Sequence, residues 1–225
     1  MRVTLLYSLL FAVSTGLSAQ AQLKTISRSS SSEQIMERFS AKVEEHPSVE
    51  IRFTFSGADK YGGAMDILEG IIYRQGTDYA MLNQQIEVYA FGDTKWIYTV
   101  ANNEAIVMLH DPSSIDLAEN PLALFSAQLS KEYSLSGKPT FSIDKGQEVG
   151  EISLVPKAKD VPYLSILLRI NLQSLSPHSV RYSAKDGSWY EATITAYTHR
   201  EQSFPFEQFT FSLENHPGVY VTDLR

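Results

Sequence analysis

The stretch VEIRFTF, residues 49–55, decides the fold class of this 225-residue chain. Apolar and polar side chains alternate strictly along it. The apolar row is Val49, Ile51, Phe53 and Phe55, and the polar row is Glu50, Arg52 and Thr54. Successive strand residues point to opposite faces of a sheet, so the alternation predicts a strand with one buried face.

Similar apolar stretches follow on both sides of short turn sequences such as Gly92-Asp93 and Asn102-Asn103. The strands predicted in this way include 65–74, 79–82, 86–90, 95–100, 104–109 and 209–213. Short links between successive strands are typical of antiparallel hairpins. We predict a mainly β protein of about ten or eleven strands in one barrel or strongly curved sheet.

Two segments have the pattern of short helices. Ser31 and Gln34 have the spacing of a helix capping box, and Pro47 marks the end of that helix. Its apolar side consists of Ile35, Met36, Phe39 and Val43. Pro121 suits the first turn of a second helix, whose apolar residues include Leu122 and Phe125.

The N-terminus has the order of a secretory signal peptide. Arg2 precedes an apolar run at 3–13, and small residues lead to Ala19-Gln20-Ala21. We therefore expect residues 1–21 to be a signal peptide, cleaved between Ala21 and Gln22. The apolar run is shorter than the roughly 20 residues of a membrane span, so the mature protein is expected to be exported and soluble. Residues 22–32 then form a flexible polar lead-in, and 33–225 form a single domain.

Composition argues against several function classes. The chain has no cysteine, so it has neither a disulfide nor the cysteine that carries the lipid of a bacterial lipoprotein. Its net charge of −7, with no basic cluster, disfavours nucleic acid as a partner.

Motifs for catalysis are likewise missing from the sequence. No nucleophile elbow, phosphate loop or paired metal-ligand histidines occur in it. His110 and Asp111 are adjacent, and we interpret them as a surface pair at a strand end. We expect no catalytic residues, metal or cofactor. Whether the apolar rows fill each other in a sandwich or line a cavity remains open from alternation alone.

Several segments, in order along the chain, resemble the LolA family of periplasmic lipoprotein carriers. LEGIIYR at 68–74 is similar to the family's Gly-x-Leu-x-x-Lys-Arg-Pro strand, and GDTKWIY at 92–98 is similar to its Asp-Gly-Lys-x-x-Trp-x-Tyr hairpin. NPL at 120–122, LVPK at 154–157, and FTF at 209–211 followed by PGV at 217–219 and VTD at 221–223 continue the match.

The resemblance implies an incomplete antiparallel β-barrel closed by two or three short helices that act as a lid. The family carries the acyl chains of lipoproteins from an inner-membrane ABC-type extractor to an outer-membrane acceptor. It implies a periplasmic location and, for a shuttle, a monomer. Two alternatives remain: a related protein that binds another lipid or fatty-acyl species, and a non-transport envelope protein or an enzyme on the same fold.

The resemblance also implies roles for particular residues. Arg74 matches the family arginine that hydrogen-bonds the lid, although Gln75 stands where the family has proline. Lid-helix contacts are expected from Ile35, Met36 and Phe39. The expected lipid cavity consists of Phe53, Phe55, Tyr79, Met81, Trp96, Tyr98, Leu122 and Phe125. Ile97 and Val100 form a rival inward row on the strand that carries Trp96.

Overall fold

The computed structural model describes residues 26–111, 133–159 and 161–225. Within them, one long sheet holds twelve strands, and a single α-helix precedes it. The elements are α1 (Ser32–Glu45), β1 (Ser48–Ala58), β2 (Leu68–Gln75), β3 (Asp78–Asn83), β4 (Ile86–Phe91), β5 (Thr94–Thr99), η1 (Val100–Asn102), β6 (Glu104–Leu109), β7 (Tyr133–Asp144), β8 (Gln147–Pro156), β9 (Tyr163–Asn171), β10 (Pro177–Ala184), β11 (Trp189–His199), η3 (Phe206–Phe209) and β12 (Tyr220–Asp223). The protein is therefore mainly β, as predicted.

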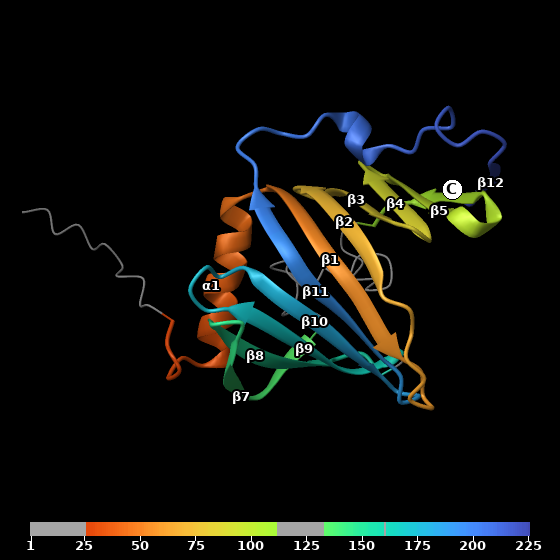
Figure 1. Cartoon of the computed structure of the whole chain (residues 1–225). Helices are drawn as coiled ribbons and strands as arrows, with labels where there is room; N and C mark the ends of the chain where they lie inside the picture. Colours follow the sequence, from red (N-terminus) through yellow and green to blue (C-terminus); the bar gives the residue numbers. More distant parts are fainter. Residues whose placement is uncertain (1–25, 112–132, 160) are drawn as a thin grey trace, which may run out of the picture.

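Strand β1, which contains the stretch 49–55, lies in the middle of the sheet. It pairs with β2 on one side and β11 on the other, and the full order is β12-β6-β5-β4-β3-β2-β1-β11-β10-β9-β8-β7. The sheet curves without closing, because its edge strands β12 and β7 do not pair with each other (Figure 1). This agrees with the predicted incomplete barrel. Every pairing is antiparallel except that of β12 with β6, which is parallel.

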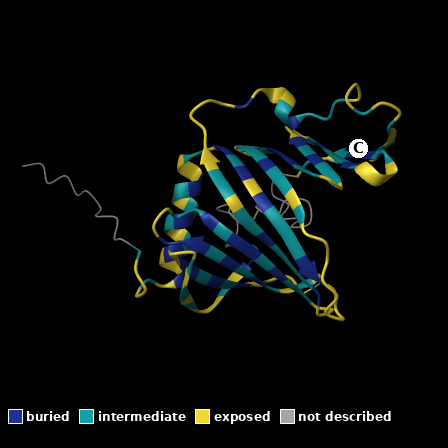
Figure 2. Ribbon diagram, in the orientation of Figure 1, coloured by how far each residue is buried: buried dark blue, intermediate teal, exposed yellow. Residues whose placement is uncertain are grey.

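One face of the sheet, which we call the inner face, carries the main hydrophobic core. Ile35, Phe39 and Val43 of α1 are buried against it. Banding along the strands in Figure 2 shows the alternation of buried and more exposed residues that the sequence predicts. The predicted capping box is also confirmed, since the Gln34 amide donates to the Ser31 hydroxyl and the Ser31 amide donates to the Gln34 side chain.

Helix α1 runs across the ends of several strands. Near its start, the Ser32 hydroxyl lies 3.4 Å from the Gly137 carbonyl of β7. The Ile35 side chain lies over Gly150 of β8, where an added Cβ would be 3.7 Å from Ile35 Cδ1. Just past its last residue, the rings of His46 and His199 of β11 are 3.8 Å apart. The helix therefore spans one half of the sheet, from the edge strand β7 to β11 beside the central strand β1. We call the two halves on either side of β1 the arms of the sheet: β7–β11 is one, and β2–β6 with β12 is the other.

The opposite, outer face is covered over β2–β5 by the C-terminal segment, residues 200–219. Phe204 and Phe209 are buried there in a second cluster with Ala80 of β3. The strand predicted at 209–213 is wrong, because residues 206–209 form a 3-10 turn and residues 210–219 belong to no strand. Its Phe211 ring instead stacks on Trp96 of β5, and its Phe209 is buried in the second cluster.

Two predicted segments lie outside the described residues: the signal peptide at 1–21 and the second helix around 121–129. Across the parts of the chain that the structure does describe, no helix has the length and apolar character needed to cross a membrane.

Candidate functional site

The inner face is a continuous apolar surface contributed by both arms of the sheet. Cross-strand pairing aligns Ile51 with Ile72, and Ile72 with Met81. Met81 in turn pairs with Val88, which pairs with Ile97. On the other arm the corresponding row is Ala192, Val180, Leu168 and Ile152. Such a surface has no chemistry of its own beyond exclusion of water, which makes it suitable for contact with hydrocarbon.

Several residues predicted for the cavity and lid meet on this face. Phe53, Tyr79 and Met81 are buried in the main cluster, with 4%, 7% and 3% of their surfaces exposed. Phe55 packs against the same cluster, and its ring stacks on Tyr190 with centroids 6.0 Å apart. Of the expected lid-helix residues, Ile35 and Phe39 are buried in this cluster and Met36 packs at its margin.

Trp96 and Tyr98 lie elsewhere. The Trp96 ring stacks on Phe211 at 5.0 Å, and the Tyr98 ring lies 4.5 Å from that of His216. Both therefore face the C-terminal segment on the outer face, while the rival residue Ile97 packs against the main cluster. The physical reason is that β5 has apolar residues on both sides and both sides are covered. Leu122 and Phe125 lie outside the described residues.

Arg74 occupies an unusual position for a cation. It lies on β2 opposite Val49 and Tyr79, within the apolar row of the inner face. Its Nε is buried and has no hydrogen-bond partner among the described residues. Burial lowers the pKa of its guanidinium, an effect that Tyr197 and Glu44 oppose electrostatically. Burial likewise raises the pKa of Tyr197, and the nearby Arg74 charge works against that rise.

A second basic side chain, His110, reaches the same end of the inner face. Its ring meets that of Tyr79 edge-on, with centroids 5.8 Å apart, and its Nε2 is buried with no hydrogen-bond partner within the described part of the chain. The interpretation of His110 as one of a surface pair therefore misses this contact. The sequence feature that points to this contact is spacing: His110 stands two residues beyond Met108, so both side chains are on the same side of an extended chain.

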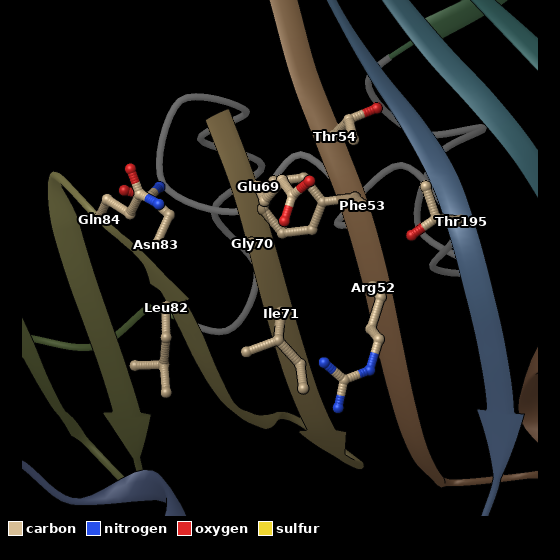
Figure 3. Close-up of a pocket in the computed structure, with 10 residues that line it drawn as sticks. All are labelled: Arg52, Phe53, Thr54, Glu69, Gly70, Ile71, Leu82, Asn83, Gln84 and Thr195. Carbon is tan, nitrogen blue, oxygen red and sulfur yellow. The ribbon is translucent and has the colours of Figure 1, made fainter. Parts of the chain in front are cut away.

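A pocket of about 500 Å³ lies where β1, β2 and β3 meet (Figure 3). Its lining residues are Arg52, Phe53, Thr54, Glu69, Gly70, Ile71, Leu82, Asn83, Gln84 and Thr195. The Phe53 ring lies against Gly70. The lining combines polar side chains with the apolar Ile71 and Leu82 and the buried ring of Phe53.

The outer face of the other arm carries a polar network. The His178 Nε2 and the Asp144 carboxylate are 2.8 Å apart, and this hydrogen bond lowers the pKa of Asp144. Arg169 lies 3.3 Å from Glu151 and 3.5 Å from Asp144. Within the described residues, no group of three or more His, Cys, Asp or Glu side chains is placed to hold a metal ion.

The fold and the inner face together define a class: an open, curved antiparallel sheet with a helix packed on a long apolar face. No protein-family profile matches the chain. No curated protein matches its sequence.

Solved structures do match. An uncharacterized conserved protein from Thermus thermophilus has a TM-score of 0.52 at 10% identity, over 83% of this chain and 98% of that one. A LolA superfamily protein from Nitrosomonas europaea has a TM-score of 0.43 at 11% identity, covering 81% and 98%. The lipoprotein LppX from Mycobacterium tuberculosis has 0.40 at 10%, covering 73% and 94%. These structural neighbours include a protein of the LolA superfamily, and at these identities the likeness concerns the fold alone.

Proposed function

We propose that this protein is a soluble periplasmic carrier that shields the acyl chains of lipoproteins between the inner and the outer membrane. The observation that supports this most directly is the apolar inner face, which crosses strands of both arms and against which α1 lays its apolar side. A face of this kind can replace water around a hydrocarbon chain.

The free energy of moving an acyl chain through water explains why a carrier is needed. Each methylene transferred from water to an apolar surface contributes about 0.8 kcal/mol, so an acyl chain does not leave a membrane unshielded at a useful rate. A carrier must also release the chain, which calls for a cover that moves. We propose that α1 and the 121–129 segment, with Leu122 and Phe125, form this lid, and that Arg74 is its latch.

A second candidate is a related carrier of another lipid or fatty-acyl species. The observation that favours it is that Arg74 Nε and His110 Nε2, at one end of the apolar face, are buried and have no hydrogen-bond partner among the described residues. A lipoprotein's acyl chains would present no charge to them.

The remaining parts of the proposal follow from the sequence. Residues 1–21 would direct export, and 33–225 would act as one carrier domain and as a monomer. Its partners would be an inner-membrane ABC-type extractor and an outer-membrane acceptor. A carrier has no catalytic step, so we propose that the protein is not an enzyme.

Native mass spectrometry of the protein from the periplasm tests the carrier function, with Met81→Gln as the variant and Ile67→Gln as its control. Met81 is buried on the inner face and Ile67 is 69% exposed. We expect lipid or lipoprotein adducts on the parent protein and on Ile67→Gln, and a several-fold smaller fraction on Met81→Gln, because an amide on the apolar face loses hydration.

The masses separate the two candidates, since a triacylated peptide and a free lipid differ. A transfer assay between extractor and acceptor vesicles gives a second readout. A parent protein with no adduct and no transfer of either cargo would contradict the proposal.

A further inference from the structure

Two buried side-chain nitrogens at the same end of the inner face have no hydrogen-bond partner among the described residues: Arg74 Nε and His110 Nε2. Both adjoin one residue. Tyr79 is the cross-strand partner of Arg74, and its ring is in edge contact with the His110 ring. Lys95 continues the same row across the sheet, because Tyr79 pairs with Ala90 and Ala90 pairs with Lys95. Lys95 is itself buried, with 9% of its surface exposed.

The two unpartnered nitrogens, Arg74 Nε and His110 Nε2, are costly unless something binds there. An unsatisfied buried polar group costs roughly 1–3 kcal/mol, and a charged one costs more. The carboxylate of Glu44 on α1 acts on Arg74 through space, yet Glu44 is exposed, and within the described residues no hydrogen bond joins the two. Arginine does not lose its proton at neutral pH, so the partly buried guanidinium of Arg74 stays charged while its buried Nε has no hydrogen-bond partner among the described residues.

Resting on the second candidate function, a carrier of another lipid or fatty-acyl species, we propose that Arg74 and His110 together bind the anionic head group, a carboxylate or a phosphate, of an amphiphile whose hydrocarbon chain lies along the inner face. The guanidinium offers a planar fork of donors that matches the two oxygens of either group. The chain would follow β3 away from this end, where Met81 lies two residues beyond Tyr79 on the same face and pairs with Val88.

A binding experiment can separate this role from that of a lid latch. A latch stabilises the closed protein whatever the chemistry of the bound chain. A head-group contact discriminates between ligands of equal chain length that differ only in charge. The discrimination, and not the absolute affinity, is therefore the quantity to measure.

Displacement of the neutral fluorophore N-phenyl-1-naphthylamine from the full mature protein measures it. The competitors are palmitate, hexadecyl phosphate and hexadecanol, each below its aggregation concentration. We expect the two anions to compete at concentrations at least about tenfold lower than the alcohol, the effect of one charge-assisted hydrogen bond. The variant Arg74→Gln/His110→Phe should bring all three to the same value, and Arg74→Lys should restore part of the preference.

Arg52→Gln is the matched control, because Arg52 is an exposed arginine on the neighbouring strand, with its guanidinium 2.9 Å from Glu50. It should keep the full preference. Equal competition by hexadecanol and palmitate in the parent protein would overturn the head-group site and leave the carrier function standing. Failure of every chain to compete, together with absent lipoprotein transfer, would contradict both. Stabilisation by inorganic phosphate equal to that by hexadecyl phosphate in a thermal melt would overturn the lipid as the source of the anion.

Discussion

Position 70 has room for a hydrogen atom and nothing larger. Gly70 faces Phe53 across the β1–β2 pair, and an added Cβ would lie 2.4 Å from Phe53 Cζ and 2.8 Å from Cε1. Phe53 is 4% exposed, so its ring has little space to move aside. The glycine thus permits an aromatic ring to lie flat on the inner face at the point where β1 carries its bulge between Arg52 and Phe53.

We therefore expect Gly70→Ala to destabilise the protein by about 1–3 kcal/mol, the usual cost of overpacking a core, in equilibrium urea unfolding. Glu69→Ala, at the exposed neighbouring position of the same strand, is the control and should change the unfolding free energy by less than about 0.5 kcal/mol. In a Phe53→Ala background the cost of Gly70→Ala should largely disappear. A cost that persists in that background would show that the clash with Phe53 is not its cause.

At the scale of elements, the C-terminal end of α1 is held by a group of titratable side chains. The His46 and His199 rings lie 3.8 Å apart, Tyr197 meets His199 edge-on at 5.1 Å, and the Lys42 ammonium lies 2.7 Å from Glu45. Arg74 of β2 faces the same end through Glu44. Desolvation lowers the pKa of His199, and the neighbouring His46 and Lys42 lower it further, while Glu45 acts in the opposite direction.

This predicts a pH dependence of known sign. Between its lowered folded pKa and the ordinary histidine pKa of about 6.5, His199 binds fewer protons in the folded than in the unfolded chain. The unfolding free energy should therefore be at its full value above about pH 6.5 and decrease as the pH falls through that window. His199→Gln should flatten the dependence, and His46→Gln should reduce it, because one cause of the shift is removed.

Urea unfolding between pH 5 and 8 measures the dependence, and hydrogen exchange of residues 40–46 shows whether α1 loosens first. His178→Gln is the control, since His178 lies on the outer face beside Asp144 and should not alter exchange in α1. Unchanged slopes in both His199→Gln and His46→Gln would contradict the argument.

The elements differ in how well the sequence predicts them, and distance along the chain explains the difference. The start of α1 can be predicted because Ser31 and Gln34 hydrogen-bond to each other's backbone amides within one turn. Strand β1 can be predicted because its polar side chains, Glu50, Arg52 and Thr54, all lie on one side of the strand. By contrast, the sequence does not predict which side of β5 faces inward. The reason is that Trp96 and Tyr98 are covered by Phe211 and His216, more than a hundred residues later in the chain. The parallel pairing of β12 with β6 depends on the same distant segment.

The candidate site divides in the same way. The apolar residues Phe53, Tyr79 and Met81 are predictable because burial on a strand follows from alternation and from the family resemblance. Only the family resemblance predicts a role for Arg74, because the spacing of one arginine on a strand does not distinguish a buried cation from a solvated one. His110 joins the site only because β2, β3 and the end of β6 are brought together by pairing across the sheet.

At the scale of the whole molecule, the two faces of the sheet are buried by different parts of the chain. The inner face is packed by α1, and the outer face of β2–β5 by residues 200–219. The latter contact centres on Phe211, whose ring lies 5.0 Å from that of Trp96 and 4.3 Å from that of His216. The His216 Nδ1 lies 2.7 Å from the Ser212 carbonyl oxygen, and its Nε2 lies 3.2 Å from the Glu87 carboxylate. This outer packing therefore fixes the C-terminal segment without using the inner face.

That separation predicts that stability and chain binding can be changed independently. Phe211→Ala should lower the unfolding free energy by about 1–3 kcal/mol, because it removes several aromatic contacts worth about 0.5–1.5 kcal/mol each beyond their buried area, while solvent fills part of the gap. In a Trp189→Phe background Trp96 is the remaining tryptophan, and its emission should shift to longer wavelength as its ring meets water. Phe206→Ala, at a side chain that is 59% exposed, should leave emission and stability nearly unchanged. Binding of N-phenyl-1-naphthylamine should stay the same in both variants at temperatures where they are folded. A loss of binding in Phe211→Ala, with the fold intact, would show that the outer packing also shapes the inner face and would move the C-terminal segment into the carrier mechanism.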